Sequence, residues 1–163
     1  MKKIGILGTG TVGKTIGSAL IKLGYEVKIG SRTADNSTAR EFVQNAGSAA
    51  FHGTFADAAQ FSDLLFNCTM GMASLQALEL AGKENLKEKI LIDLSNPLDF
   101  SKGMPPSLSV CNTNSLAEQI QTAFPETLVV KTLNIVNCEV MVNPGKTGGE
   151  PSMFLCGNSA HAK

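Results

Sequence analysis

The chain has 163 residues, of which 43% are hydrophobic and 17% are charged, as in a soluble globular protein with one sizeable core. Fourteen basic and fourteen acidic residues cancel, so no overall field attracts nucleic acid or an anionic membrane surface. One Tyr and no Trp leave few platforms for base stacking, and no apolar run is long enough to span a membrane. We therefore expect a cytoplasmic protein without nucleic-acid or membrane partners.

Residues 4–17, IGILGTGTVGKTIG, predict a strand, a tight turn and a helix in direct succession. The glycines fit the G-x-G-x-x-G pattern of dinucleotide-binding folds at Gly8, Gly10 and Gly13. In this interpretation Gly8 makes the turn and Gly10 lets a pyrophosphate approach the backbone, while Gly13, with Gly17 as a second candidate, lets the helix pack closely. The phosphates then bind to free N–H groups at the positive end of the helix.

The same stretch also satisfies a second phosphate-binding motif. The pattern G-x-x-x-x-G-K-[ST], the P-loop of nucleotide hydrolases, is matched by Gly8, Gly13, Lys14 and Thr15. A later apolar run, ILID, ends in Asp93, whose carboxylate could help to hold a magnesium ion. The glycine-rich stretch alone therefore leaves two classes of function open.

Apolar runs and helical patterns alternate along most of the chain. Further strands are expected at residues 26–30, 49–51, 63–68, 89–94, 128–133 and 152–156. Helices are expected at residues 11–23, 54–60, 71–81 and 115–124, with one further helical turn at 85–89. Another helix is expected to follow a cap at Asp35, Asn36 or Ser37 and to end at Gly47, and capping boxes open the helices at Thr54 and Ser115. Residues 99–106 and 143–151 are expected to be loops. Short connections between alternating strands and helices predict an α/β fold, a doubly wound and mostly parallel sheet of the Rossmann NAD(P)-binding type, in a single domain.

The tip of the second expected strand favours the dinucleotide interpretation. That tip lies beside the adenosine ribose, where an NAD enzyme places an Asp or Glu on the 2′-hydroxyl. This chain has Ser31, Arg32 and Thr33 there, and the nearest acid, Asp35, lies beyond the expected position. A guanidinium with two hydroxyls suits a 2′-phosphate, so the sequence predicts NADP(H) rather than NAD(H). The P-loop interpretation leaves this pattern unexplained.

Ligands of such a sheet bind outside the carboxyl ends of the strands. The candidates at these ends are Cys68, Thr69 and Met70, then Ser95, Asn96 and Pro97, and Asn134 after the next strand. No catalytic residue is predicted, because His52 is expected in a loop and no carboxylate–His or Lys–Tyr arrangement is evident. The absence of a proton shuttle favours hydride exchange between two cofactors, which needs positioned rings. No metal site is predicted, and the four cysteines are expected to be reduced and mostly in or near the core.

The segments IGILGTGTVGKTIGSAL, KIGSR, LLFNCT and LIDLSNP resemble the NADP reductases that use a deazaflavin coenzyme (F420). They are also similar to the cytoplasmic domain of the six-transmembrane metalloreductases. The resemblance implies NADP(H) bound by Thr9, Ser31 and Arg32, with Thr11 and Val12 at the pyrophosphate. It further implies that residues 69–70 and 95–97 line the nicotinamide side, where hydride passes to a deazaflavin or flavin.

The family continues past the last strand with helices that complete the second-substrate pocket and the dimer. Residues 1–163 are therefore expected to form the NADP(H)-binding domain without that extension, and a homodimer is a candidate assembly. The sequence leaves two alternatives to an oxidoreductase. One is a non-catalytic NADP(H) sensor, and the other is the P-loop nucleotide hydrolase.

Overall fold

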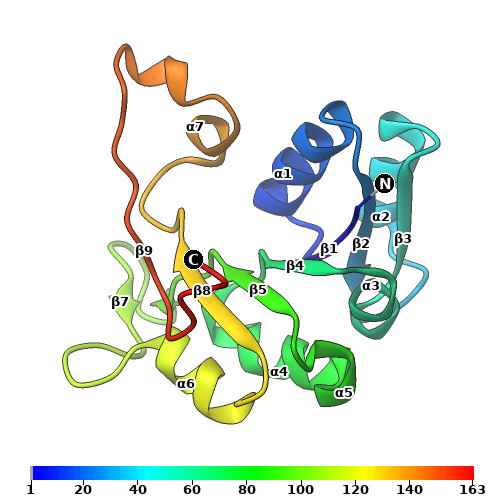
Figure 1. The fold of residues 1–163 in the computed structure, drawn as a ribbon. Coiled ribbons are helices and arrows are strands. Elements are labelled where there is room, and N and C mark those ends of the chain that lie inside the picture. The colour runs from blue at the N-terminus through cyan, green and yellow to red at the C-terminus, as the bar shows by residue number, and fades with distance from the viewer. Residues whose placement is uncertain (1) are drawn as a thin grey trace.

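The computed structural model describes residues 2–163, which form one seven-stranded sheet between two layers of helices (Figure 1). The strand order is β3-β2-β1-β4-β5-β8-β9, and every pair is parallel except β8 and β9. The chain adds β1, β2 and β3 toward one edge of the sheet and then β4, β5 and β8 toward the other, as in a doubly wound sheet. The strands are β1 (Lys3–Leu7), β2 (Glu26–Ser31), β3 (Ala50–Thr54), β4 (Leu64–Asn67), β5 (Ile90–Asp93), β8 (Leu128–Thr132) and β9 (Leu155–Cys156).

Each face of the sheet has its own hydrophobic core, because successive side chains of a strand point to opposite faces. On β1, Ile4 and Ile6 pack against one layer, whereas Leu7 packs against the other. The first layer consists of α1 (Thr11–Lys22), α2 (Ser37–Ala46) and α7 (Cys138–Val142). The second consists of α3 (Phe55–Phe61), α4 (Gly71–Ala81), α5 (Lys83–Leu86) and α6 (Leu116–Ala123).

Side-chain caps start α2, α3 and α6 at residues that the sequence offers as caps, namely Asn36, Thr54 and Ser115. The Asn36 side chain accepts from the N–H of Ala39 at 3.0 Å. Thr54 and Asp57 form a reciprocal capping box, and the hydrogen bonds from the Thr54 backbone and side chain lower the pKa of Asp57. These caps fix where α2 and α3 begin, and α2 is the first helix after the tip of β2.

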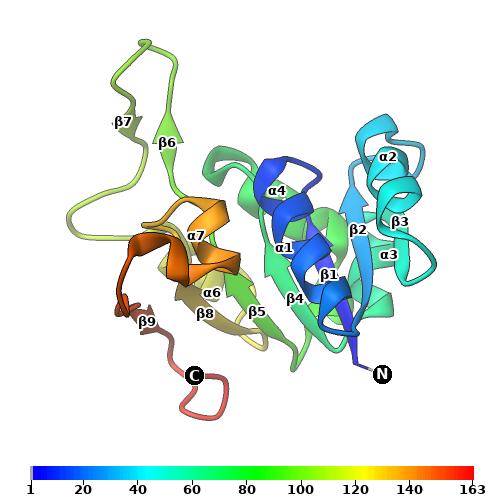
Figure 2. The same ribbon diagram turned by 90° about the horizontal axis from the view of Figure 1, so that it is seen from above.

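The structure differs from the sequence-based expectations in several connections. β3 runs to Thr54, so it is longer than expected, and α5 begins at Lys83 instead of residue 85. The expected loop at 99–106 lies within a short antiparallel hairpin that stands away from the sheet (Figure 2). The expected loop at 143–151 contains a 3₁₀ helix, and the expected last strand shortens to two residues. The elements that the sequence did not predict are β6 (Leu98–Asp99), β7 (Ser107–Leu108), α7 (Cys138–Val142) and η1 (Pro144–Thr147).

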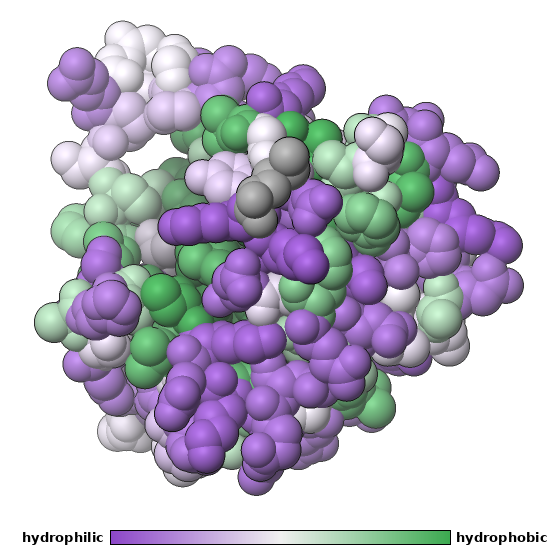
Figure 3. Space-filling model, turned by 45° about the vertical axis from the view of Figure 1, so that its right-hand side comes forward, coloured by the Kyte–Doolittle hydropathy of each residue, from purple (hydrophilic) through white to green (hydrophobic). Residues whose placement is uncertain are grey.

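Hydrophilic side chains cover most of the face shown in Figure 3, with hydrophobic ones visible between them. Across residues 2–163, none of the helices has the length and apolar character needed to cross a membrane. The cytoplasmic location stays a prediction.

Candidate functional site

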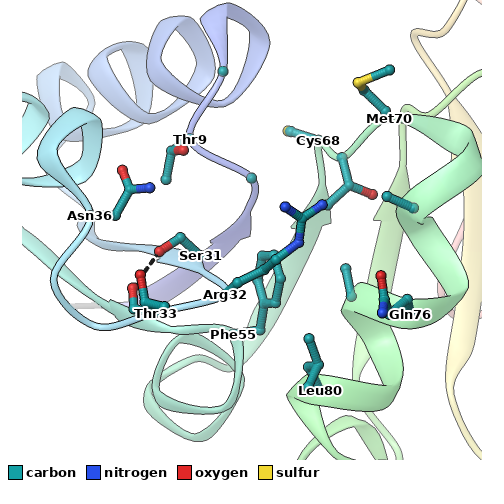
Figure 4. A pocket seen from close by; sticks show the side chains of 15 residues that line it. Thr9, Ser31, Arg32, Thr33, Asn36, Phe55, Cys68, Met70, Gln76 and Leu80 are labelled. Atoms are coloured by element: carbon teal, nitrogen blue, oxygen red, sulfur yellow. Dashed lines mark hydrogen bonds between the residues drawn. The ribbon is translucent and has the colours of Figure 1, made fainter.

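A cavity of about 520 Å³ opens at the carboxyl ends of β1, β2 and β4, the edge where sheets of this kind bind ligands. The β1–α1 turn and the tip of β2 form one wall, and α4 forms the opposite wall (Figure 4). No Asp or Glu is among the described residues that line it, so the cavity suits an anionic ligand. The lining consists of Gly8, Thr9, Gly10, Ser31, Arg32, Thr33, Asn36, Phe55, Cys68, Thr69, Met70, Ala73, Gln76, Ala77 and Leu80.

The β1–α1 turn depends on two glycines. Gly8 has a φ of 114°, which L side chains rarely adopt, and a Cβ there would lie 2.7 Å from the carbonyl oxygen of Cys68. A Cβ at Gly13 would overlap the carbonyl oxygen of Gly8, so α1 packs on the turn only because Gly13 has no side chain. Both residues therefore have the turn and packing roles that the sequence predicts. Gly17 also packs tightly, against Phe42 and Ile6.

Gly10 leaves the N-terminus of α1 open. It is the N-cap residue and has an extended backbone, with φ −76° and ψ −176°. No side chain caps this helix end, and its first turn contains no acidic residue. The first N–H groups of a helix lack partners within it, so those of Thr11 and Val12 can bind an anion. A Cβ at Gly10 would meet no protein atom within 4 Å, which leaves room for a ligand beside the backbone.

The tip of β2 brings a positive charge to this cavity. Ser31 is buried, and its Oγ donates to the carbonyl oxygen of Thr33 at 2.5 Å, which fixes the turn after the strand. Arg32 is exposed, and its side chain extends across the cavity (Figure 4). The neighbouring acid, Asp35, pairs instead with Arg40 at 2.8 Å. None of the ion pairs in the described chain involves Arg32, so its guanidinium can bind a phosphate group.

The geometry disagrees with the P-loop interpretation. α1 begins at Thr11, so Lys14 lies a turn into the helix and not in the loop that would surround the phosphates. Lys14 and Thr15 line a depression between α1 and α7, where the Lys14 ammonium lies 4.0 Å from the Glu41 carboxylate. Asp93 is completely buried and is hydrogen-bonded to other side chains. The residues that the P-loop would need are thus directed elsewhere.

A second cavity, of about 190 Å³, lies at the carboxyl ends of β4 and β5. Cys68, Thr69 and Met70 line both cavities, so the β4–α4 loop forms a shared wall. Within the described chain, no charged side chain and no histidine lines this second cavity. Its lining consists of Val12, Cys68, Thr69, Met70, Gly71, Leu94, Ser95, Asn96, Leu98 and Phe100.

A buried polar network joins the ends of three strands behind the second cavity. Asp93 of β5 is completely buried, and one of its oxygens lies 2.9 Å from the Lys131 ammonium of β8. The other oxygen accepts from Asn67 Nδ2 at 2.8 Å and from Ser95 Oγ at 2.7 Å. The side-chain oxygen of Asn67, Oδ1, then accepts from Thr69 Oγ1 at 2.7 Å. The network thereby fixes the loops after β4 and β5, which line the cavities.

Four of the predicted cofactor-binding residues line neither cavity. Asn134 reaches the second cavity through Asn96: the Asn96 amide donates to the Asn134 carbonyl oxygen at 2.7 Å, and the Asn134 amide donates back at 3.0 Å. Pro97 follows a lining residue, and Thr11 and Gly13 lie in the first turn of α1. The other predicted residues line at least one cavity, and cofactor binding by all of them stays a prediction.

Sequence reasoning missed the α4 wall of the first cavity. The residues concerned recur at helical spacing and are Ala73, Gln76, Ala77 and Leu80. This spacing indicates a helix face, but the sequence does not show that the stripe borders a cavity as well as the core. Asn36 and Phe55 were also missed as lining residues; Asn36 was recognisable as a helix cap, and its position after the β2 tip was the available signal.

Two expectations about histidine and cysteine are corrected. His52 lies within β3 and not after it, and its Nδ1 lies 3.1 Å from a backbone carbonyl oxygen. The cysteines are free, but they do not lie mostly in the core: Cys111 and Cys156 are exposed, whereas Cys68 and Cys138 are half-buried. Among the described residues, no three His, Cys, Asp or Glu side chains form a group that could hold a metal ion.

Cys68 is expected to be unreactive although it borders both cavities. Burial, and to a lesser degree the negative charge of Asp93, raises the pKa of its thiol to about 12, so it stays protonated in mildly alkaline buffer. We expect iodoacetamide to alkylate Cys111 and Cys156 in the folded protein and to spare Cys68, as measured by peptide mass spectrometry. The denatured protein, in which all cysteines react, is the control. Fast alkylation of Cys68 in the folded state would contradict the raised pKa.

Comparison with known proteins shows the family of the chain. Residues 3–97, more than half of the chain, match the family described as NADP oxidoreductase, coenzyme F420-dependent. A crystallised protein from Arthrobacter sp. FB24, provisionally described as an F420-dependent NADP reductase, is 48% identical with a TM-score of 0.91, and the match covers 99% of this chain and 76% of that one.

Two longer proteins match this chain over part of their own length. Rat (Rattus norvegicus) metalloreductase STEAP3 is 28% identical over 162 residues, which are 99% of this chain but 30% of that protein. A reductive aminase from Aspergillus terreus, solved in complex with NADPH, is 22% identical with a TM-score of 0.62 over 85% of this chain and 42% of that one, and so shares the fold. The resemblance inferred from the sequence is therefore confirmed, and the chain belongs to the coenzyme F420-dependent NADP oxidoreductase family.

Proposed function

We propose that this chain binds NADP(H) in preference to NAD(H) and transfers hydride between NADP(H) and a deazaflavin, a flavin or another small acceptor. The observation that most strongly supports this proposal lies at the tip of β2. There Arg32 extends without an acidic partner into a cavity that has no Asp or Glu in its described lining. Family membership supports the reaction class, and the acceptor is the finer part of the proposal.

The adenosine half of the cofactor would lie in the first cavity. Arg32 would hold the 2′-phosphate through a charged, planar fork of N–H groups, with the hydroxyl of Thr33 beside it. The N–H groups at the start of α1 would bind the pyrophosphate, next to the open space at Gly10. The chain thus offers donors and positive charge where the ligand is anionic.

The nicotinamide half would lie toward the second cavity, past the β4–α4 loop. When bound, NADP(H) supplies the hydride, and the residues of this chain hold and shield the ring. Val12 and Leu94 offer apolar contact, while the Asn96–Asn134 pair holds the loops after β5 and β8 together. Since no histidine or charged side chain lines this cavity within the described chain, a proton needed by the acceptor would come from solvent.

The acceptor site would be completed by protein outside the second cavity. At about 190 Å³ this cavity is smaller than a typical pocket for a drug-sized ligand, roughly 300–1,000 Å³. Met70 and Phe100 on its rim are 67% and 47% exposed, so apolar surface remains for another wall. We propose that residues 1–163 act as the NADP(H)-binding part, and that a further segment or a second copy of the chain supplies this wall.

Calorimetric titration of the purified chain with NADPH, NADH and magnesium-ATP tests the cofactor. We expect NADPH to bind at least about tenfold more tightly than NADH, because a charge-assisted hydrogen bond is worth about 1.5–3 kcal/mol. We expect no heat from magnesium-ATP. Equal binding of NADPH and NADH would contradict the proposed preference, and binding of magnesium-ATP alone would restore the P-loop interpretation.

The second candidate is a non-catalytic NADP(H) sensor, which the small, open acceptor cavity favours. Loss of NADPH absorbance in the presence of a deazaflavin or flavin distinguishes the two functions. Turnover that saturates with acceptor concentration supports the oxidoreductase. Tight NADPH binding without turnover of NADPH in the presence of either acceptor would favour the sensor.

A further inference from the structure

The buried polar network behind the second cavity forms a chain of side-chain contacts from Lys131 to Thr69. Lys131 contacts Asp93, Asp93 accepts from Asn67, and Asn67 accepts from Thr69. Asp93 and Asn67 are completely buried, whereas Thr69 is half-buried and lines both cavities. The buried Asp93 carboxylate is thus connected to the Thr69 hydroxyl on the cavity wall through two hydrogen bonds between side chains.

The carboxylate of Asp93 fixes the orientation of the Asn67 amide. A carboxylate only accepts hydrogen bonds, and its other neighbours here are donors, namely Lys131 Nζ and the N–H and Oγ–H of Ser95. Asn67 must therefore present its Nδ2 to Asp93 and its oxygen to the opposite side. On that side the oxygen lies 3.3 Å from the backbone nitrogen of Thr69, whose N–H can only donate. Both ends of the amide thus require the same orientation.

The orientation of Asn67 in turn fixes the role of the Thr69 hydroxyl. Its Oγ1 lies 2.7 Å from the Asn67 oxygen, which cannot donate, so the one hydroxyl proton of Thr69 is used there. Ser74 Oγ lies 2.8 Å from Thr69 Oγ1 and 3.3 Å from the Met70 carbonyl oxygen, so the single Ser74 proton is donated to one of these two acceptors. In either case Thr69 keeps at least one free lone pair and has no proton to offer. Toward the cavities it is a hydrogen-bond acceptor.

We propose that Thr69 Oγ1 accepts a hydrogen bond from the nicotinamide-ribose half of NADP(H), and that Asp93 and Lys131 are positioning residues that keep this acceptor turned toward the ligand. This inference rests on the proposed function. The donor on the ligand is a ribose O–H or the carboxamide N–H₂. Phosphate oxygens carry no proton at neutral pH and gain nothing from Thr69. The N-terminus of α1 offers hydrogen-bond donors, whereas Thr69 offers an acceptor. The pyrophosphate is therefore expected at α1, and the ribose and the nicotinamide ring at Thr69.

Three ligands of increasing length locate the interaction. 2′,5′-ADP lacks the second ribose, 2′-phospho-ADP-ribose adds its hydroxyl groups, and NADPH adds the nicotinamide with its carboxamide. In calorimetric titrations, we expect Thr69→Val to leave the affinity for 2′,5′-ADP unchanged and to weaken NADPH by about 3- to 10-fold, the cost of one hydrogen bond. Thr69→Ser keeps the hydroxyl and is the matched control, with affinities close to those of the wild type.

The pattern of losses identifies the donor. A loss with both 2′-phospho-ADP-ribose and NADPH assigns a ribose hydroxyl, and a loss with NADPH alone assigns the carboxamide. Unchanged affinity for both ligands in Thr69→Val overturns the inference while the cofactor site stands. If wild-type protein binds none of the three ligands, the proposed function fails and the inference fails with it.

A double-mutant cycle tests the positioning role of Asp93. In Asp93→Asn only the 3.3 Å contact with the Thr69 N–H still orients the Asn67 amide, so the amide can turn and the Thr69 proton can point toward the cavity. We expect Thr69→Val to cost NADPH affinity in the wild type and to have little effect in the Asp93→Asn background. Asn67→Leu breaks the same link without separating Lys131 from Asp93, and it gives the same result if Asp93→Asn does not fold. If Asp93 had a purely structural role, its substitution would weaken the binding of 2′,5′-ADP as well. An equal cost of Thr69→Val in all backgrounds overturns the positioning role.

Discussion

Gly10→Ala is expected to leave the free energy of unfolding unchanged and to weaken NADPH binding by about 10- to 100-fold. The backbone of Gly10 is extended, and a Cβ there meets no protein atom within 4 Å, so the folded chain accommodates alanine. The methyl group would occupy the space in which the pyrophosphate approaches the start of α1. Losing one hydrogen bond to a charged group costs about 1.5–3 kcal/mol. Urea unfolding and calorimetric titration measure the two quantities.

Gly13→Ala is the matched variant three residues further on, and we expect the opposite balance. Its Cβ would overlap the carbonyl oxygen of Gly8, so α1 must move away from the turn. We expect the free energy of unfolding to fall by about 1–3 kcal/mol, as for other overpacked sites. If Gly10→Ala destabilises the fold as much as Gly13→Ala does, or if it binds NADPH normally, then the open space at Gly10 is not the pyrophosphate site.

The sheet could be predicted from the sequence because each of its central strands is specified locally. Runs such as the one that contains Ile4 and Ile6 alternate with helical patterns, and short connections impose parallel pairing. The Thr54 capping box placed the start of α3 correctly, since a cap is a contact over three residues. For α2 the sequence offered three candidate caps, and the structure shows that Asn36 is the one used. Local patterns of this kind need no knowledge of the rest of the chain.

Several elements after residue 97 were not predicted because they are short. α7 has five residues and no apolar period long enough to be recognised, and it forms where Asn137 caps a helix that packs on α1. β6 and β7 have two residues each, so the pairing of Leu98 with Leu108 depends on the loop between them. The two exposed cysteines were misjudged for a similar reason, because the segments around Cys111 and Cys156 have little packing of their own.

The candidate site shows the same division between local and long-range information. Ser31 and Arg32 follow a strand at the distance that the dinucleotide pattern predicts, so they could be named in advance. Asp93 could be recognised as a polar strand end, but its partner Lys131 is 38 residues away and on another strand. Only the folded sheet shows that this pair lies behind the β4–α4 loop. A binding motif can be read along the chain, whereas the polarity of a cavity wall depends on which strands are neighbours.

Arg32→Ala is expected to weaken NADPH binding by about 10- to 150-fold and to change NADH binding far less. The estimate follows from the loss of charge-assisted hydrogen bonds, worth about 1.5–3 kcal/mol, to a phosphate that only NADPH carries. Arg32 is exposed and has no ion-pair partner in the described chain, so its removal is expected to cost little stability. Arg32→Lys should recover part of the affinity, because an ammonium keeps the charge but loses the bidentate fork.

Arg40→Ala is the control for charge alone. Arg40 lies on α2 and pairs with Asp35 at 2.8 Å, and it does not line the cavity. The loss of its exposed charge changes the net charge of the protein as Arg32→Ala does, so a general electrostatic effect would weaken NADPH in both variants. We expect calorimetry to show the loss in Arg32→Ala only. If NADPH and NADH weaken equally in Arg32→Ala, the guanidinium does not bind the 2′-phosphate, and the preference for NADP(H) must come from elsewhere in the cavity.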